Sequence, residues 1–119
     1  PRVRRQRQMC IRDSLKQFSW IELPPVLPDY IQTSYYFFHI QLKNGKRDQF
    51  AKFLRENGIY TTYRYYPLHR VSGYGVTGNF PNADYAADNT LNLPIHQSIS
   101  NEELNYMLDK IKEFDSLFC

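Results

Sequence analysis

The fold of this chain is organised around Gly58–His69, which reads Gly-Ile-Tyr-Thr-Thr-Tyr-Arg-Tyr-Tyr-Pro-Leu-His. Gly58 ends a helical pattern, because glycine readily adopts the left-handed conformation that stops a helix. The β-branched and aromatic residues after it predict a strand over Ile59–Tyr65. Pro67 then leads into a loop that begins with His69 and Arg70. A guanidinium, several phenols and an imidazole therefore gather where a strand becomes a loop, a common place for side chains that bind a ligand.

A strand and a helix are predicted before this stretch. Ser34–Leu42 is aromatic and β-branched and alternates at its end, which predicts a strand. The strand's apolar face consists of Phe38, Ile40 and Leu42, and His39 lies on the half-exposed face. Arg47–Asn57 predicts an amphipathic helix. Its apolar stripe is Phe50, Phe53 and Leu54, and its charged residues, Arg47 included, are expected in water. Strand, helix and strand with short joints indicate a βαβ unit or a split relative of it.

The second half of the chain predicts a long loop, a short helix, a short strand and a last helix. Pro67–Pro81 is an irregular segment long enough to be a functional candidate. Asn82–Asn89 predicts a helix that packs through Tyr85, Ala86 and Ala87, and Leu91–Leu93 predicts a strand. Ser100 and Glu103 form the capping box of the last helix. Its buried stripe is Leu104, Met107, Leu108 and Ile111, with Phe114 at the flank. The fold class is α/β, in the form of a small α+β-like domain.

The N-terminal residues differ from the rest in charge. Of the 15 Lys and Arg residues, five lie in residues 1–13 against one of the 12 acidic residues. The remaining chain has no basic surplus, so we predict neither a nucleic-acid nor a membrane partner. Arg4–Asp13 resembles, in one reading frame, the translation of a transposon-type adapter used to prepare DNA sequencing libraries. We therefore interpret residues 1–13 as a non-native tail. The alternative is a basic arm that binds RNA or phospholipid.

On this interpretation the native sequence begins near Ser14 and the chain is a C-terminal fragment. Residues 14–33 contain closely spaced prolines and predict an extended connector, from which Trp20 packs against a neighbouring part of the protein. Residues 34–119 then form the domain. Cys10 and Cys119 have no partner at metal-ligand spacing, which suits a reducing cytoplasm. No apolar run is long enough to span a bilayer.

Enzyme signatures are absent from the chain taken alone. His39, His69 and His96 are far apart and lack carboxylates at ligand spacing, so we predict no metal site. Residue chemistry by itself leaves open a free-standing α/β ligand-binding or regulatory module.

Four segments, in order and at plausible spacing, resemble a known family. They are Tyr35–Leu42 with Arg47-Asp48, Glu56–Ile59 with Thr61, Tyr65–His69, and Ala86–His96 with Ser100–Glu103. Together they resemble the C-terminal small domain of the DegT/DnrJ/StrS sugar-nucleotide aminotransferases, which are pyridoxal 5'-phosphate enzymes of the aspartate-aminotransferase fold. The resemblance implies a cytoplasmic homodimer that transfers an amino group from a glutamate-like amino-acid donor to a keto-sugar nucleotide. This reaction would serve deoxyaminosugar or polysaccharide biosynthesis.

The resemblance also implies which residues meet which ligand. The family's large domain holds the cofactor and its lysine, and no lysine here lies in a matching context, so we predict no catalytic or cofactor-binding residue and no activity of this chain alone. The small domain would supply one wall of the substrate site. Arg64 would pair with a diphosphate, Tyr65 would stack or donate its hydroxyl, and His69 would hydrogen-bond a sugar hydroxyl or carbonyl oxygen.

Each of these residues also has a structural alternative. Arg64 could form a salt bridge on a strand face, Tyr65 could lie in the core, and His69 could bond to loop backbone. Arg64 stands where the family often has histidine, and Tyr66 where it has proline or a small residue, which leaves the sugar open. We expect a structural role for His96 and a solvated Arg70.

Overall fold

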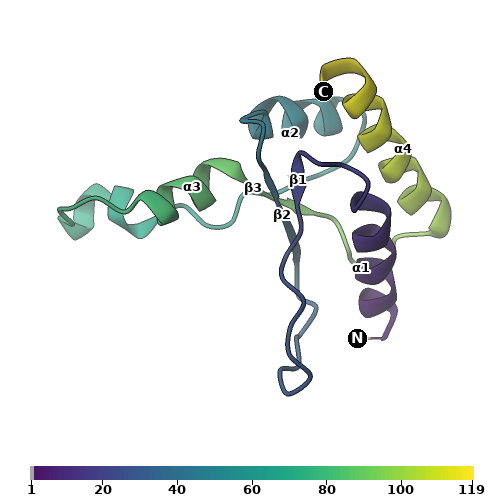
Figure 1. Ribbon diagram of the computed structural model, residues 1–119, viewed down its shortest axis with the longest axis horizontal. Helices are drawn as coiled ribbons and strands as arrows, with labels where there is room; N and C mark the ends of the chain where they lie inside the picture. Colours follow the sequence, from purple (N-terminus) through teal and green to yellow (C-terminus); the bar gives the residue numbers. More distant parts are fainter. Residues whose placement is uncertain (1) are drawn as a thin grey trace.

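A three-stranded antiparallel sheet in the order β1-β2-β3 is the centre of the computed structural model, which describes residues 2–119 (Figure 1). The strands are β1 (Ile21–Glu22), β2 (Phe38–Leu42) and β3 (Thr90–Leu93). The α-helices are α1 (Arg2–Leu15), α2 (Arg47–Glu56), α3 (Pro81–Asn89) and α4 (Asn101–Phe118). Two 3-10 helices, η1 (Leu68–Arg70) and η2 (Ser72–Tyr74), lie before α3. Helices α1, α2 and α4 gather on one side, whereas η1, η2 and α3 project from the other as an arm (Figure 1).

Strand β2 confirms the predicted alternation. Phe38, Ile40 and Leu42 are fully buried, whereas His39 is half-buried. In the register of the sheet, Phe38 lies opposite Leu93 and Leu42 opposite Ile21. The strand starts at Phe38 rather than at Ser34, because the chain turns before it: Tyr35 has a φ of 51°, outside the range of extended backbone.

The prediction of a strand over Ile59–Tyr65 is wrong, because this segment makes only an isolated β-bridge. Thr62 pairs with Asn92 through two backbone hydrogen bonds of 3.2 and 2.9 Å between amide nitrogen and carbonyl oxygen. β3 is only four residues long and is followed by Pro94, so it offers few further partners. β3 runs antiparallel both to β2 and to the bridge. The segment after α2 is therefore parallel to β2 with β3 between them, which is the predicted split relative of a βαβ unit.

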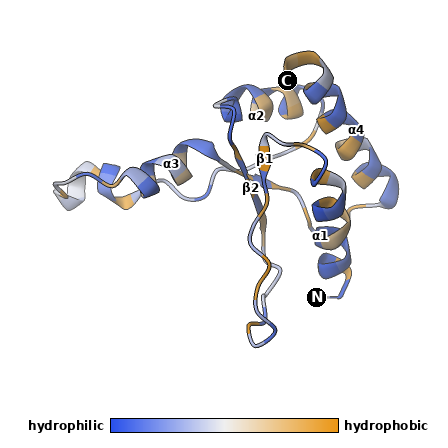
Figure 2. Cartoon of the chain, viewed as in Figure 1, coloured by the Kyte–Doolittle hydropathy of each residue, from blue (hydrophilic) through white to orange (hydrophobic). Residues whose placement is uncertain are grey.

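The hydrophobic core lies between the sheet and α1, α2 and α4. The Trp20 ring centroid is 5.4 Å from that of Phe50 and 5.6 Å from that of Phe114, and its Nε1 donates to Asp115 at 2.6 Å. Phe114 is fully buried among these rings, so it is a central residue of the core rather than a flanking one. Hydrophobic and hydrophilic residues alternate along α2 and α4 (Figure 2).

Residues before 34 also contribute to the packed core. Ile11 and Leu15, from α1, are fully buried in the same core as the sheet. Residues 14–33 also differ from a plain connector, because they contain the end of α1, the buried Trp20 and the strand β1. The foreign origin of residues 1–13 stays a prediction, since packing does not reveal where a sequence came from.

Two local predictions about helix ends are confirmed. Gly58 has a φ of +77° after the end of α2. Ser100 Oγ accepts the backbone N–H of Glu103 at 3.1 Å, and the Glu103 carboxylate accepts the N–H of Ser100 at 2.7 Å, so the capping box opens α4. This hydrogen bond from the Ser100 backbone, followed by that from its side chain, lowers the pKa of Glu103.

Helix α3 does not pack as predicted. None of its residues is buried, and Tyr85 is 46% exposed. The arm formed by η1, η2 and α3 is therefore held by polar contacts rather than by a core of its own. No helix within residues 2–119 is both long enough and apolar enough to cross a membrane.

Candidate functional site

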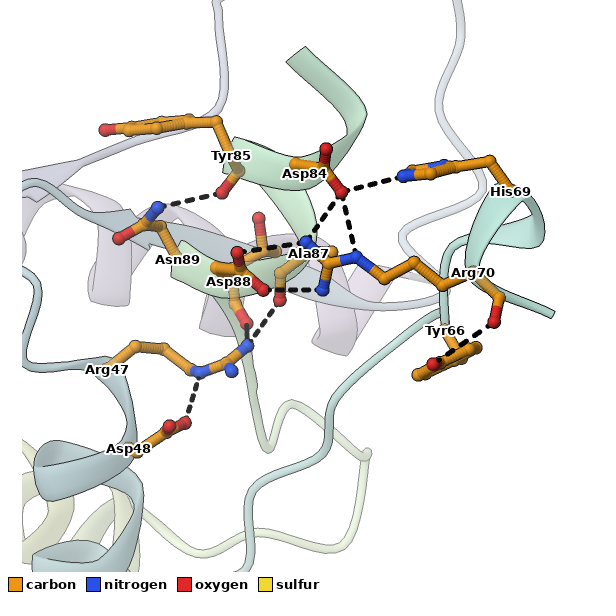
Figure 3. Close-up of polar contacts among 11 residues, drawn as sticks. Arg47, Asp48, Tyr66, His69, Arg70, Asp84, Tyr85, Ala87, Asp88 and Asn89 are labelled. Atoms are coloured by element: carbon orange, nitrogen blue, oxygen red, sulfur yellow. Dashed lines mark hydrogen bonds and ion pairs between the residues drawn. The ribbon is translucent and has the colours of Figure 1, made fainter. Parts of the chain in front are cut away.

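Arg70 joins the loop to α3 through paired carboxylates. Asp84 and Asp88 stand four residues apart on α3 and so share one face of the helix. Arg70 NH1 and NH2 donate to the two carboxylate oxygens of Asp88 at 2.8 and 3.0 Å, and Nε donates to Asp84 Oδ1 at 2.8 Å (Figure 3). The hydrogen bonds from Arg70 lower the pKa of Asp88 and raise that of Arg70. Arg70 is exposed to solvent, as expected, and it is also paired with two carboxylates from one helix face, which was not predicted.

His69 shares the same carboxylate. Its Nε2 lies 2.7 Å from Asp84 Oδ1, and its ring centroid is 5.0 Å from that of Phe80 (Figure 3). The hydrogen bond from His69, followed by that from Arg70, lowers the pKa of Asp84. His69 thus contacts a carboxylate, rather than the loop backbone that the structural alternative named. Asp84 was not foreseen, although its four-residue spacing from Asp88 on a predicted helix was a readable signal.

Arg47 binds the C-terminal end of α3. Its NH1 donates to the carbonyl oxygens of Ala87 and Thr90 at 2.6 and 3.3 Å, which are at the C-terminal end of the helix. Its guanidinium also lies 4.5 Å from the ring centroid of Tyr63, within cation–π range. Only 14% of the side chain is exposed, so the prediction that Arg47 lies in water is wrong. Its partners stand some 40 positions away in the sequence, beyond the reach of a helical pattern.

A cleft of about 400 Å³ opens between the arm, the start of α2 and the segment after Thr62. Its lining combines three arginines and three tyrosines with two carboxylates: Arg47, Arg64, Arg70, Tyr63, Tyr65, Tyr66, Asp48 and Asp88. Arginine presents several donors in a planar fork that matches phosphate geometry, and phenol rings offer faces for stacking. Arg47 and Arg70 already pair with Asp48 and Asp88, so Arg64 is the guanidinium in this cleft that can meet an anionic group beside the phenol rings.

The structure brings Arg64 and Tyr65 together in this cleft. Arg64 NH1 donates to the Tyr36 hydroxyl at 3.2 Å, and its guanidinium carbon is 5.7 Å and 6.0 Å from the ring centroids of Tyr36 and Tyr65. Hydrogen bonds to Tyr36 and then to Tyr65 raise the pKa of Arg64. Tyr65 is 71% exposed and so does not lie in the core. Within residues 2–119 none of the ion pairs includes Arg64, so the alternative of a strand-face salt bridge is not what the structure shows.

His69 is placed differently from the other two predicted residues. It belongs to the arm beside Asp84 and is not part of the lining of the 400 Å³ cleft. Arg64 also lines a second, smaller cleft of about 290 Å³, which contains His96 and Tyr36. Sequence reasoning missed Tyr36, because the run of aromatic residues that contains it was assigned to a strand.

Comparison with known proteins identifies the family. The sequence model of the DegT/DnrJ/EryC1/StrS aminotransferase family matches residues 2–112. The chain belongs to this family.

Two curated relatives and one solved structure show the extent of the likeness. The chain is 43% identical over 91 residues to a dTDP-4-dehydro-2,3,6-trideoxy-D-glucose 4-aminotransferase of Saccharopolyspora spinosa, covering 76% of this chain and 24% of the relative. It is 34% identical over 95 residues to a pleiotropic regulatory protein of Geobacillus stearothermophilus, covering 75% and 26%. The aminotransferase TlmJ of Streptoalloteichus hindustanus has a TM-score of 0.93 at 35% identity, covering 99% of this chain and 32% of its own. The chain thus spans about a quarter of the length of the curated relatives.

Proposed function

We propose that the protein to which this chain belongs is a transaminase that moves an amino group from a glutamate-like donor to a keto-sugar nucleotide, with pyridoxal 5'-phosphate as its cofactor. The observation that carries this proposal is family membership together with 43% identity to an aminotransferase of a dTDP-linked keto-deoxysugar. The cleft supports it independently. Arginines and phenols side by side suit a ligand with a diphosphate and a sugar or base.

The residues of this chain do not fit the role of holding the cofactor covalently. When bound, pyridoxal phosphate would take up the amino group from the donor and pass it to the acceptor, and a lysine would anchor the cofactor between reactions. None of the six lysines of the chain lines the cleft. Several instead pair with carboxylates close by in sequence, as Lys52 does with Glu56 and Lys110 with Glu113. We therefore place the cofactor and its lysine in a part of the protein outside this chain, and propose that the chain is inactive alone.

Arg64, Tyr65 and His69 are the proposed substrate contacts. Arg64 has no carboxylate partner among the ion pairs of the described residues and is exposed in the cleft, so its fork can donate two parallel hydrogen bonds to a diphosphate. The exposed ring of Tyr65 beside it can stack on a base or sugar face. His69 would reach the substrate from the arm. The same proposal includes a homodimeric enzyme in the cytoplasm.

The proposal is tested on the intact enzyme with glutamate and a dTDP-linked 4-keto-6-deoxysugar. We expect 2-oxoglutarate and an amino sugar in equal amounts; absence of both products would refute the proposed activity.

Arg64→Ala tests the substrate contact. It should raise KM for the sugar nucleotide by roughly tenfold or more, and kcat less, because it removes an interaction with a non-reacting group. Arg55→Ala, on the exposed face of α2 and outside the cleft, is the matched loss of a guanidinium and should leave KM unchanged. An unchanged KM in Arg64→Ala would assign Arg64 a structural role.

A further inference from the structure

His69 is held by one carboxylate. Its Nε2 lies 2.7 Å from Asp84 Oδ1, and its ring packs beside that of Phe80 at a centroid distance of 5.0 Å. The His69 side chain is 16% exposed to solvent. In the part of the chain that the structure describes, no hydrogen bond reaches Nδ1. One ring nitrogen is thus engaged by the protein, and the other is left for a further partner.

The charge of Asp84 decides which ring nitrogen carries the proton. Hydrogen bonds from His69 and then Arg70 lower the pKa of Asp84, so this carboxyl group is ionised at neutral pH. An ionised carboxylate can only accept hydrogen bonds, so Nε2 of His69 must donate. A neutral imidazole with a proton on Nε2 has a lone pair on Nδ1 and accepts there.

We propose that Asp84 is a positioning residue, which holds the His69 ring with Nε2–H toward its carboxylate so that Nδ1 accepts a hydrogen bond from a substrate hydroxyl or N–H group. This proposal rests on the proposed role of His69 in substrate binding and narrows its chemistry. A sugar hydroxyl can donate to Nδ1, whereas a carbonyl oxygen can only accept.

The chain contains a matched control for this role. Asp84 and Asp88 lie on the same face of α3, and both bind Arg70. Only Asp84 also contacts His69 (Figure 3). Replacing either aspartate therefore weakens the attachment of the arm through Arg70, but only replacement of Asp84 releases the imidazole.

Steady-state kinetics of the intact enzyme separate the two effects, with dTDP-4-dehydro-6-deoxyglucose as the varied substrate. We expect Asp84→Ala to raise KM roughly three- to tenfold with a smaller change in kcat, the scale of one lost hydrogen bond. In an enzyme that already carries His69→Ala, Asp84→Ala should raise KM no further, because the hydrogen bond between His69 and the substrate is already absent. Asp84→Asn should restore most of the affinity, since its amide oxygen still accepts the Nε2 proton.

Asp88→Ala should raise KM less than Asp84→Ala does, and its effect should add to that of His69→Ala. Equal effects of Asp84→Ala and Asp88→Ala, both additive with His69→Ala, would overturn the proposal and leave Asp84 as an anchor of Arg70 only. An unchanged KM in His69→Ala would also overturn it, while the transaminase activity itself stood.

Nitrogen-15 NMR of the histidine-labelled protein reports on the ring directly and needs no activity, so it still tests Asp84 if the wild-type enzyme makes no amino sugar. At a pH where the ring is neutral, His69 should show a protonated Nε2 and an unprotonated Nδ1. This pattern should change in Asp84→Ala and persist in Asp88→Ala, with His39 and His96 as internal references. A proton on Nδ1 in the wild type, or a His69 spectrum that Asp84→Ala leaves unaltered, would overturn the proposal.

Discussion

Replacing Ile11 by alanine tests whether α1 belongs to the folded unit. Ile11 is fully buried and shares the core with Leu15 and the strands of the sheet. Truncating such a residue to alanine removes buried methylene groups and leaves a cavity, which costs about 2–5 kcal/mol of unfolding free energy. We take about 3 kcal/mol, a large fraction of the roughly 5–15 kcal/mol typical of a whole domain.

Urea unfolding of the purified chain, followed by the fluorescence of Trp20, measures this cost. With an m value of about 1.5 kcal/mol per molar urea, typical of a small domain, the midpoint should fall by about 2 M. Met9→Ala is the control on the same helix, because Met9 is 52% exposed. It should change the unfolding free energy by less than about 0.5 kcal/mol.

The reasoning fails if the two substitutions behave alike. Should Ile11→Ala and Met9→Ala both leave the midpoint in place, α1 does not pack on the sheet and residues 1–13 are an appended tail in the structural sense too. A large effect of Ile11 with none of Met9 would place the start of the domain within α1, whatever the origin of that sequence.

Three further predictions concern stability. Gly58→Ala should cost about 1 kcal/mol, because its φ of +77° strains any side chain even though there is space for a Cβ; Gly73→Ala, with open space and no positive φ, is the control in the same urea titration. Ser100→Ala should cost about 1 kcal/mol through loss of the N-cap, and Ser100→Asp, which also caps, should cost less; equal losses would contradict the capping role. The pKa values of Asp84 and Asp88 are lowered from 3.8 in the folded protein. Their contribution to stability is therefore complete above pH 3.8, and it is lost as the pH falls through the lower pKa values of the folded state. Amide hydrogen exchange of η1 and α3 should therefore lose protection in acid before that of β2, and simultaneous loss would show that these carboxylates do not hold the arm.

Residue periodicity was sufficient to predict the elements whose conformation depends on nearby residues in the sequence. The alternation of β2, the stripe of α4 and the stop at Gly58 were all predicted, since each depends on residues within a few positions of one another. The strand expected at Ile59–Tyr65 shows where periodicity misleads. Aromatic and β-branched residues favour a strand, but a strand needs a neighbouring edge, and β3 supplies one bridge only.

The candidate site divides in the same way. The sequence singled out Arg64, Tyr65 and His69 by residue type and by their resemblance to a family pattern, and the structure places Arg64 and Tyr65 in one cleft. The sequence could not indicate Tyr36, because Tyr36 and Arg64 are 28 positions apart in the chain. Nor could it indicate that Asp84 would bind His69, 15 positions away, through a turn whose path no local pattern specifies.

The sequence by itself determined the type of most elements, the N-terminal cap of α4 and the family, because backbone conformation, burial period and motif are encoded in short stretches. Only the tertiary structure decided that Arg47 is held at the end of α3, that Arg70 is paired with two carboxylates, and that α1 contributes to the core. The physical reason is that a charged or apolar side chain is satisfied by whichever partner the folded chain brings within reach. For Arg47 that partner lies some 40 residues away.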